Sequence, residues 1–254
     1  MKLHSQILGK GHHIVILHGF LGMGDNWKSI SKKMAEDHYE VHLPDARNHG
    51  KSAHSDDFTY ELMVDDLKTY FEDHNLNQVI LIGHSMGGKT AMQFASKYPD
   101  KVNKLIVVDI SPKLYQPHHD EILNSLKQLQ NKKLYSRREA ENILKEKIKD
   151  HGVRLFLLKN LKREPDNSLS LKPNIDVFLK NRYEIGRALP ENCFFKGPTL
   201  FVKGENSSYI RKKDSKLIAK HFSNYKLDVV SNSGHWVHAE NPKGFLEKIY
   251  TFTN

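Results

Sequence analysis

The chain has 254 residues, a formal net charge of +9 at neutral pH and one cysteine. This length is sufficient for a single domain with a full hydrophobic core. The lone cysteine, Cys193, excludes an internal disulfide and is typical of a reducing compartment. The first residues lack a signal-peptide pattern, and no stretch approaches the ~20 apolar residues of a membrane span. We therefore expect a cytoplasmic monomer or homodimer with no membrane span.

The positive charge is concentrated in one part of the chain. Residues 113–192 hold 17 Lys and Arg against 11 Asp and Glu. Such a surplus can attract nucleic acid, anionic lipid or an acidic substrate. No nucleic-acid-binding motif accompanies the charge. We interpret it as a solvated, lysine-rich helical surface and expect no nucleic-acid partner.

Short apolar runs alternate with amphipathic stretches, which is typical of a mostly parallel sheet covered by helices on both faces. The predicted strands are 3–8, 12–18, 39–44, 78–83, 104–109, 198–203 and 225–230. The predicted helices between and after them are 26–37, 59–74, 87–97, 212–222 and 242–252. The first two strands are predicted to form a hairpin around Gly9 and Gly11.

The alternation stops between residue 112 and residue 197. This interval is too long for one crossover helix, and its pattern predicts helices over 118–131, 136–150, 151–161 and 174–187, with a surface turn at 164–168. We interpret 112–197 as a helical cap inserted into a core domain made of 1–111 and 198–254. The cap is expected above the carboxyl end of the sheet, over Ser85.

A G-x-S-x-G pattern spans residues 83–87 and follows a buried-strand run. A sharp turn from strand to helix would hold Ser85 in strained dihedrals and expose its hydroxyl at the carboxyl end of the sheet. Glycines at 83 and 87 are needed because a Cβ there would collide with the turn. The new helix would direct its free N–H groups toward charge that develops at the hydroxyl. The pattern indicates a nucleophilic serine.

The same letters permit a second interpretation. Residues 83–90 also fit G-x-x-x-x-G-K-[ST], the phosphate-binding loop of nucleotide hydrolases. Lys89 and Thr90 would be its essential side chains, and Asp109, after the apolar run 105–108, could hold magnesium. Both interpretations require a strand, a turn and a helix, so more distant residues have to separate them.

Three distant features fit the serine interpretation and have no role in the nucleotide one. A buried-strand run at 14–17 leads into the glycine-containing loop 18–22, whose backbone can help bind an oxyanion. Asp109 ends one strand, and His235 follows a late strand. The order Ser85, Asp109, His235 is the nucleophile, acid, base order of the α/β-hydrolases.

These residues also carry a family resemblance. The chain resembles the α/β-hydrolases, and within them the small bacterial YbfF-type esterases and eukaryotic ABHD-type hydrolases. The stretches that carry the resemblance are 18–22, 45–52, 83–89, 107–112, 204–207 and 234–240. The resemblance implies hydrolysis of small acyl esters and thioesters, including acyl-CoA thioesters, with no metal and no organic cofactor. A non-catalytic ligand receptor on the same fold is the further alternative.

Two residues are candidates for the acid of the triad. Many α/β-hydrolases place it in a G-x-x-D turn, which corresponds here to 204–207 and ends in Ser207. Asp109 is then the natural acid, and Glu205 is the alternative. The resemblance implies the same aspartate, with Ser207 as a helper near the histidine.

The remaining candidates surround the serine. The backbone N–H groups of Phe20 and Met86 are predicted to bind the oxyanion. Leu21, His84 and Trp236 are candidates for the substrate pocket, and His18 is expected to bind backbone beside the oxyanion loop. His238 lies three residues after His235, but no third ligand accompanies the pair, so no metal site is expected.

Overall fold

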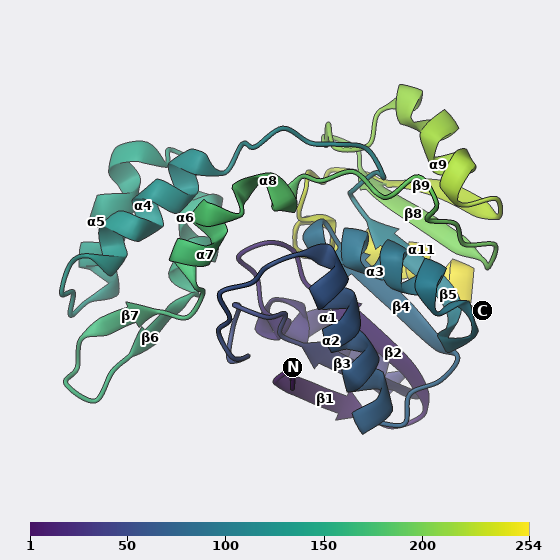
Figure 1. The fold of residues 1–254 in the computed structure, drawn as a ribbon, viewed down its shortest axis with the longest axis horizontal. Coiled ribbons are helices and arrows are strands. Elements are labelled where there is room, and N and C mark those ends of the chain that lie inside the picture. The colour runs from purple at the N-terminus through teal and green to yellow at the C-terminus, as the bar shows by residue number, and fades with distance from the viewer. Residues whose placement is uncertain (254) are drawn as a thin grey trace.

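The computed structural model describes residues 1–253, and its centre is a seven-stranded sheet with the order β1-β3-β2-β4-β5-β8-β9 (Figure 1). Only β1 runs antiparallel to its neighbour, β3. The other neighbours are parallel, as predicted. The strands are β1 (Ser5–Gly9), β2 (His12–Leu17), β3 (Tyr39–Pro44), β4 (Val79–His84), β5 (Val102–Val108), β8 (Thr199–Gly204) and β9 (Tyr225–Val230).

Helices cover both faces of this sheet. The helices of the core are α1 (Lys28–Glu36), α2 (Tyr60–Asp73), α3 (Met86–Lys97), α9 (Ser215–His221), α10 (Val237–Glu240) and α11 (Pro242–Thr253). Short 3-10 turns lie at η1 (Gly24–Trp27), η2 (Pro99–Lys101) and η3 (Lys212–Asp214). The first and third of these turns occupy the starts of the predicted helices 26–37 and 212–222.

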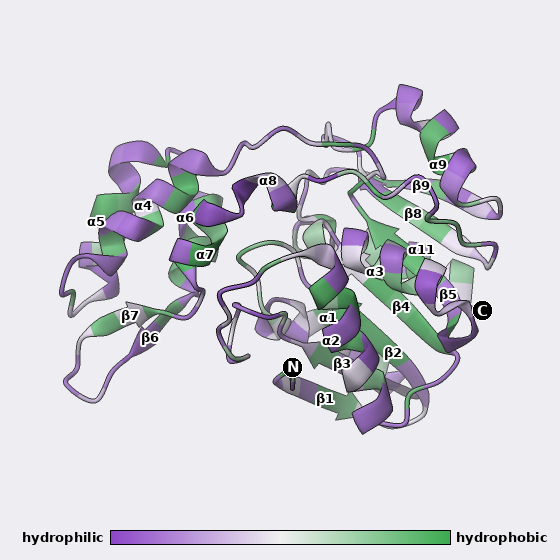
Figure 2. Cartoon of the chain, viewed as in Figure 1, coloured by the Kyte–Doolittle hydropathy of each residue, from purple (hydrophilic) through white to green (hydrophobic). Residues whose placement is uncertain are grey.

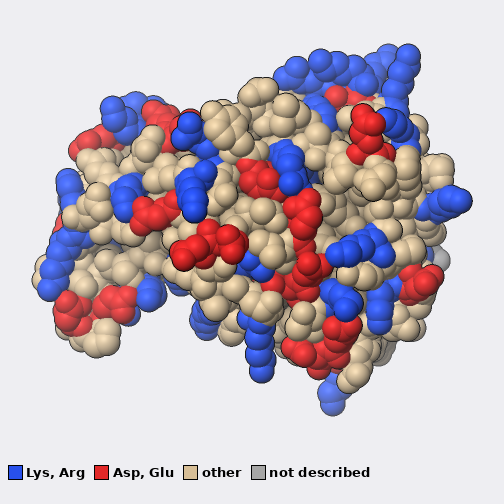
Figure 3. Space-filling model, viewed as in Figure 1, with Lys and Arg blue, Asp and Glu red and all other residues tan. Residues whose placement is uncertain are grey.

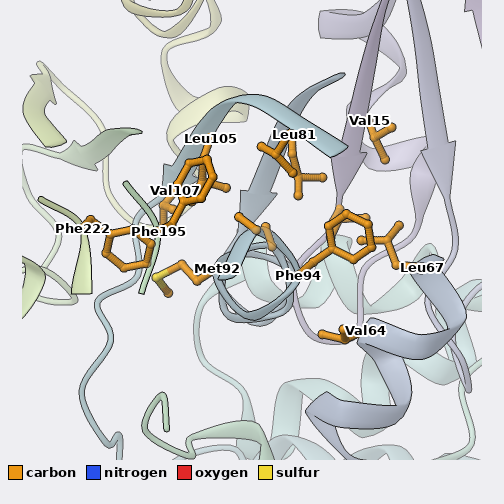
Figure 4. Packing of buried hydrophobic residues seen from close by; sticks show 14 of the residues in the cluster. Val15, Val64, Leu67, Leu81, Met92, Phe94, Leu105, Val107, Phe195 and Phe222 are labelled. Atoms are coloured by element: carbon orange, nitrogen blue, oxygen red, sulfur yellow. The ribbon is translucent and has the colours of Figure 1, made fainter. Parts of the chain in front are cut away.

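Alternate side chains of each inner strand enter different hydrophobic clusters, because successive residues of a strand point to opposite faces. Val15 and Leu81 pack against Leu67 of α2 and Phe94 of α3 (Figure 4). Ile14 and its even-numbered neighbours instead pack against α1 and α11. Burial on both faces explains why the inner strands read as continuous apolar runs.

The predicted hairpin of the first two strands is wrong. β1 pairs with β3, so β3 lies between β1 and β2 in the sheet. The side chains Val41 and Leu43 of β3 are almost fully buried, whereas Ile7 of β1 is 46% exposed. The more apolar strand therefore takes the inner position, and β1 is left at the edge.

The segment predicted as a cap, residues 112–197, stands beside the core in Figure 1. It contains α4 (Asp120–Gln130), α5 (Arg137–Lys147), α6 (His151–Leu158), β6 (Leu161–Arg163), β7 (Leu169–Leu171), α7 (Ile175–Lys180) and α8 (Arg182–Ile185). The hairpin β6–β7 encloses the predicted turn at 164–168, but its strands of three residues are too short to show periodicity. The predicted helix 174–187 is interrupted at Asn181.

The cap segment has a hydrophobic cluster of its own that continues into the core. Leu126 of α4, Leu157 of α6 and Phe178 of α7 belong to it, together with Phe20 and Met86 of the core. Hydrophobic and hydrophilic residues alternate along these helices in Figure 2. The cluster therefore ties the helices of the cap segment to the loop and helix that flank Ser85.

Lysine and arginine side chains gather at one corner of the face in Figure 3, where α9 lies. The exposed basic residues of this corner are Arg211, Lys212, Lys213, Lys216 and Lys220. Over the cap segment, acidic and basic side chains alternate on the same face. None of the helices in residues 1–253 combines the length and the apolarity that a bilayer crossing requires.

A methyl group at Gly87 should destabilise the fold, because the first turn of α3 packs directly on the end of β2. A Cβ built on Gly87 would lie 2.4 Å from the carbonyl oxygen of Leu17. We expect Gly87→Ala to lower the free energy of unfolding in urea by about 2–4 kcal/mol. The control is Gly152→Ala in α6, where the nearest atom is 3.2 Å away. A loss for Gly152→Ala as large as that for Gly87→Ala would contradict this reason.

Candidate active site

Ser85 occupies the sharp turn between β4 and α3. Its φ of 53° and ψ of −117° form a conformation that non-glycine residues rarely adopt. The Ser85 N–H donates to Val108 O at 3.0 Å, which ties the turn to the neighbouring strand. A Cβ on Gly83 would lie 2.3 Å from Gly87 O. The glycine requirement inferred from the pattern is therefore a steric property of the structure.

A fully buried carboxylate and an imidazole meet beside this turn. Asp109 follows β5, and its Oδ2 lies 2.8 Å from His235 Nδ1. The Ser207 hydroxyl donates to the same oxygen. The Gly204 N–H donates to Oδ1 at 3.2 Å. The carboxylate thus joins the ends of β5 and β8 to the loop after β9, and it fixes a proton on His235 Nδ1.

Glu205, the alternative acid, faces elsewhere. Its side chain is exposed, and Oε2 accepts the N–H of Asn232 at 2.9 Å. His235 instead has its hydrogen bond with Asp109. The turn carries Ser207 where many α/β-hydrolases have the aspartate. Its hydroxyl donates to Asp109 Oδ2, the oxygen that also binds His235.

Ser85 and His235 line one cavity of about 520 Å³. Within residues 1–253 the Ser85 hydroxyl makes no hydrogen bond, and its side chain is partly exposed. Asp109 occupies His235 Nδ1, so Nε2 is the ring nitrogen that stays available to the cavity that Ser85 also lines. Contacts between a nucleophile and its base commonly tighten only when substrate binds.

Two backbone N–H groups near Ser85 have no acceptor among the residues that the structure describes. Met86 is the first residue of α3, so its N–H has no partner within the helix. The N–H of Phe20 likewise donates to no described residue. Phe20 lies in the oxyanion loop, residues 18–22, which lines the same cavity as Ser85. Both predicted oxyanion donors are therefore available for an acceptor.

Buried, neutral histidines hold the loops of this region. His18 has its Nδ1 2.8 Å from Gly19 O, and its Nε2 accepts the N–H of Ala46 at 2.9 Å. This is the backbone role expected for it. His84 Nε2 lies 2.9 Å from His235 O and orients the loop that carries His235. Burial lowers the pKa of His18 and lowers that of His84 further, which keeps both rings uncharged.

The ring of Tyr209 stacks on that of His235, with centroids 3.8 Å apart and an angle of 13° between planes. The Tyr209 hydroxyl lies 2.8 Å from His118 Nε2. Burial raises the pKa of Tyr209 to about 12. The stack adds a second constraint on the His235 ring, next to the hydrogen bond with Asp109.

The three candidate pocket residues, Leu21, His84 and Trp236, all line the cavity. Trp236 contacts Phe156 of α6, with ring centroids 5.4 Å apart. Phe156, His119 and Tyr209 also line it and were not among the candidates. They lie on the cap segment or in the 204–211 region, and no sequence pattern connects them to Ser85.

Lys89, the essential lysine of the nucleotide interpretation, binds backbone carbonyls of the cap segment. Its Nζ donates to Lys113 O at 2.7 Å and also to Arg187 O. Lys89 is 1% exposed, and burial lowers its pKa to about 7. Both carbonyls belong to the cap segment: Lys113 lies near its start and Arg187 follows α8. The geometry gives Lys89 a structural role and does not favour a phosphate loop.

His238 stacks on Trp27, with centroids 3.7 Å apart and planes 11° apart. His238 is 5% exposed and is therefore a packed core residue. Across residues 1–253, no group of three or more His, Cys, Asp and Glu side chains is arranged to hold a metal ion.

Comparison with known proteins places the chain in a family. The family model described as the alpha/beta hydrolase fold matches residues 12–242. The chain is 37% identical to sn-1-specific diacylglycerol lipase ABHD11 of Mus musculus, covering 94% of this chain and 80% of that protein. It is 30% identical to Esterase YbfF of Escherichia coli, covering 100% and 99%. A solved structure described as a marine microorganism esterase matches with a TM-score of 0.96 and 42% identity, over 99% of both chains.

Replacing His238 should make the protein less sensitive to acid. Burial lowers its pKa from 6.5 to about 3, so the unfolded chain binds one more proton between these values. Stability is therefore lost as the pH falls from 6.5 toward 3, by about 2 kcal/mol at pH 5. His238→Phe keeps the stack on Trp27 and removes this titration.

The measurement is urea unfolding of both proteins at pH 7 and pH 5. The loss of unfolding free energy between these two pH values should be smaller in the variant by about 2 kcal/mol. An identical loss in both proteins would show that His238 does not titrate between the folded and unfolded states.

Proposed function

The chain belongs to the α/β-hydrolase family, and we propose that it is a serine hydrolase that cleaves carboxylic esters through an acyl-enzyme intermediate. The observation that carries this proposal is the 2.8 Å contact between Asp109 Oδ2 and His235 Nδ1, beside a serine on the same cavity. Ser85 is the proposed nucleophile, His235 the general base and Asp109 the acid.

In the first step Ser85 Oγ attacks the ester carbonyl carbon, and His235 Nε2 removes its proton. The new C–Oγ bond places negative charge on the former carbonyl oxygen. The N–H groups of Phe20 and Met86 are the proposed donors to this oxygen, and the loss of one such donor typically costs about 3 kcal/mol of transition-state stabilisation.

In the second step the bond between carbon and the leaving oxygen breaks, and His235 Nε2 returns the proton to the departing alcohol. Water then attacks the acyl group by the same route and releases the acid and Ser85. Asp109 keeps His235 in the tautomer with hydrogen on Nδ1 and stabilises the imidazolium. Ser207, which donates to Asp109 from the other side, is the proposed support for that carboxylate.

The cavity supports a small, largely apolar acyl group. Its wall near Ser85 is made of the oxyanion loop and of α6, with the rings of Phe156 and Trp236 in contact. The cap segment, residues 112–197, is proposed as a domain that covers Ser85, with 1–111 and 198–254 as the catalytic core. Leu21, His84 and Trp236 are the proposed pocket residues.

A CoA thioester is the second candidate substrate. The surplus of Lys and Arg in residues 113–192 favours an anionic leaving group, because basic side chains attract its phosphates. The acyl transfer chemistry at Ser85 would be the same, with a thiol in place of the alcohol.

Removal of the nucleophile should abolish turnover. We expect Ser85→Ala to lower kcat for a p-nitrophenyl ester by about a thousandfold or more, and to abolish labelling by a fluorophosphonate probe. Ser207→Ala removes one hydrogen bond to a charged group, and should lower kcat by about 10- to 100-fold while labelling is retained. Full turnover by Ser85→Ala would reject the mechanism. Absence of turnover by the unmodified protein would favour a ligand receptor.

Salt should separate the two substrate classes. If the basic side chains of residues 113–192 bind the CoA phosphates, kcat/KM for an acyl-CoA should fall steeply with rising sodium chloride concentration. A neutral p-nitrophenyl ester of the same acyl group is the control and should respond little. Equal responses would contradict the docking of phosphates on this segment.

A further inference from the structure

The oxyanion loop contains a strained residue. The Gly22 N–H donates to Gly19 O at 2.9 Å and closes a tight turn. Leu21, the third residue of this turn, has a φ of 58°. A positive φ at this position suits glycine, and for a side chain such as leucine it costs about 1–3 kcal/mol. Some other contact must therefore hold Leu21 in place.

That contact comes from the cap segment. Asn160 follows α6, and its Nδ2 donates to Leu21 O at 2.8 Å across 139 residues of sequence. The Asn160 backbone is itself fixed, because its N–H donates to Leu157 O at 3.0 Å and its carbonyl accepts the N–H of Lys172 at 2.9 Å. Asn160 therefore presents its amide to the oxyanion loop from a rigid support.

The other end of the same side chain has no partner. Asn160 is 1% exposed, and its Oδ1 makes no hydrogen bond to any described residue. Burying an unpaired carbonyl typically costs about 1–3 kcal/mol. An asparagine that leaves one atom unpaired in order to donate with the other is a poor choice for stability alone. Its donation to Leu21 is the compensating gain.

We propose that Asn160 is a positioning residue, through which docking of the cap segment holds the oxyanion hole in its working geometry. This inference rests on the proposed function. The hydrogen bond fixes the plane of the peptide that joins Leu21 to Gly22. Without it, Leu21 can relax to a negative φ, which turns the loop and moves the Phe20 N–H away from Ser85. The chemistry at Ser85 then loses one of its two oxyanion donors.

Asn160→Leu tests the proposal, because leucine has nearly the same shape and removes both the donor and the unpaired oxygen. The matched control is Asn174→Ala, on a second asparagine of the cap segment. Its Nδ2 donates to Asn48 Oδ1 at 3.3 Å, so it joins the same two parts of the molecule away from the oxyanion loop.

With a p-nitrophenyl ester, Asn160→Leu should lower kcat by about 10- to 100-fold with KM within about twofold, because the hole acts on the transition state. The inhibition constant of an alkylboronic acid, whose adduct on Ser85 places an oxygen in the hole, should rise by the same factor. Asn174→Ala should leave both values unchanged. An unchanged kcat in Asn160→Leu, a boronic acid constant that does not follow kcat, or an equal effect of Asn174→Ala would each overturn the proposal.

Hydrogen exchange separates this proposal from the proposed function. The amide hydrogen of Gly22, which donates to Gly19 O, should exchange faster in Asn160→Leu than in the unmodified protein or in Asn174→Ala, whether or not esters are hydrolysed. Unchanged exchange would reject the positioning role by itself. Faster exchange in a protein without Ser85-dependent turnover would confirm that Asn160 holds the loop, and would reject the ester hydrolysis that gives the loop its role.

Discussion

The buried carboxylate of Asp109 is the constraint on which the site depends. A charge in the interior is costly unless it is paired and hydrogen-bonded. Asp109 meets this condition with donors from Gly204, Ser207 and His235, which come from two other segments of the chain. Those segments can reach it only if β5 and β8 are neighbours and the loop after β9 folds over their ends. The pairing of the strands and the position of His235 are therefore parts of one requirement.

Several residues with an unfavourable backbone conformation lie at the same site. Within residues 1–253, nine non-glycine residues have a positive φ, and most are Asn or lie in surface turns. Leu21 and Ser85 differ, because both line the cavity and their side chains do not favour this conformation, and Asp109 binds His235, which lines the same cavity. Hydrogen bonds hold each one: Asn160 for Leu21, Val108 for Ser85 and the strand β8 for Asp109. The rigid sheet and the cap segment thus maintain a geometry that the isolated segments would not adopt.

Features that depend on local sequence could be predicted, and features that depend on competition between distant segments could not. The turn at Ser85, the inner strands and the meeting of Asp109 with His235 depend on local sterics and on the rule that parallel strands end at one edge of the sheet. The features that were missed or wrong include the partner of β1, the strands β6 and β7, and Tyr209 above His235. Each depends on competition between distant segments, such as β1 and β3 for the place beside β2. A single sequence carries no local pattern for that competition.

Asn160 shows why the cap segment has to be read together with the core. Its own neighbourhood predicts only the end of a helix, and an asparagine there suits any turn. Only the structure shows that Leu21, 139 residues away, has a strained conformation. It also shows that the Asn160 amide is the donor that holds Leu21. In the proposed function, the cap segment supplies both a wall of the cavity and a support for the oxyanion loop. The proposed positioning role separates two tasks of this segment: its helices line the cavity, and Asn160 supports the loop beside Ser85.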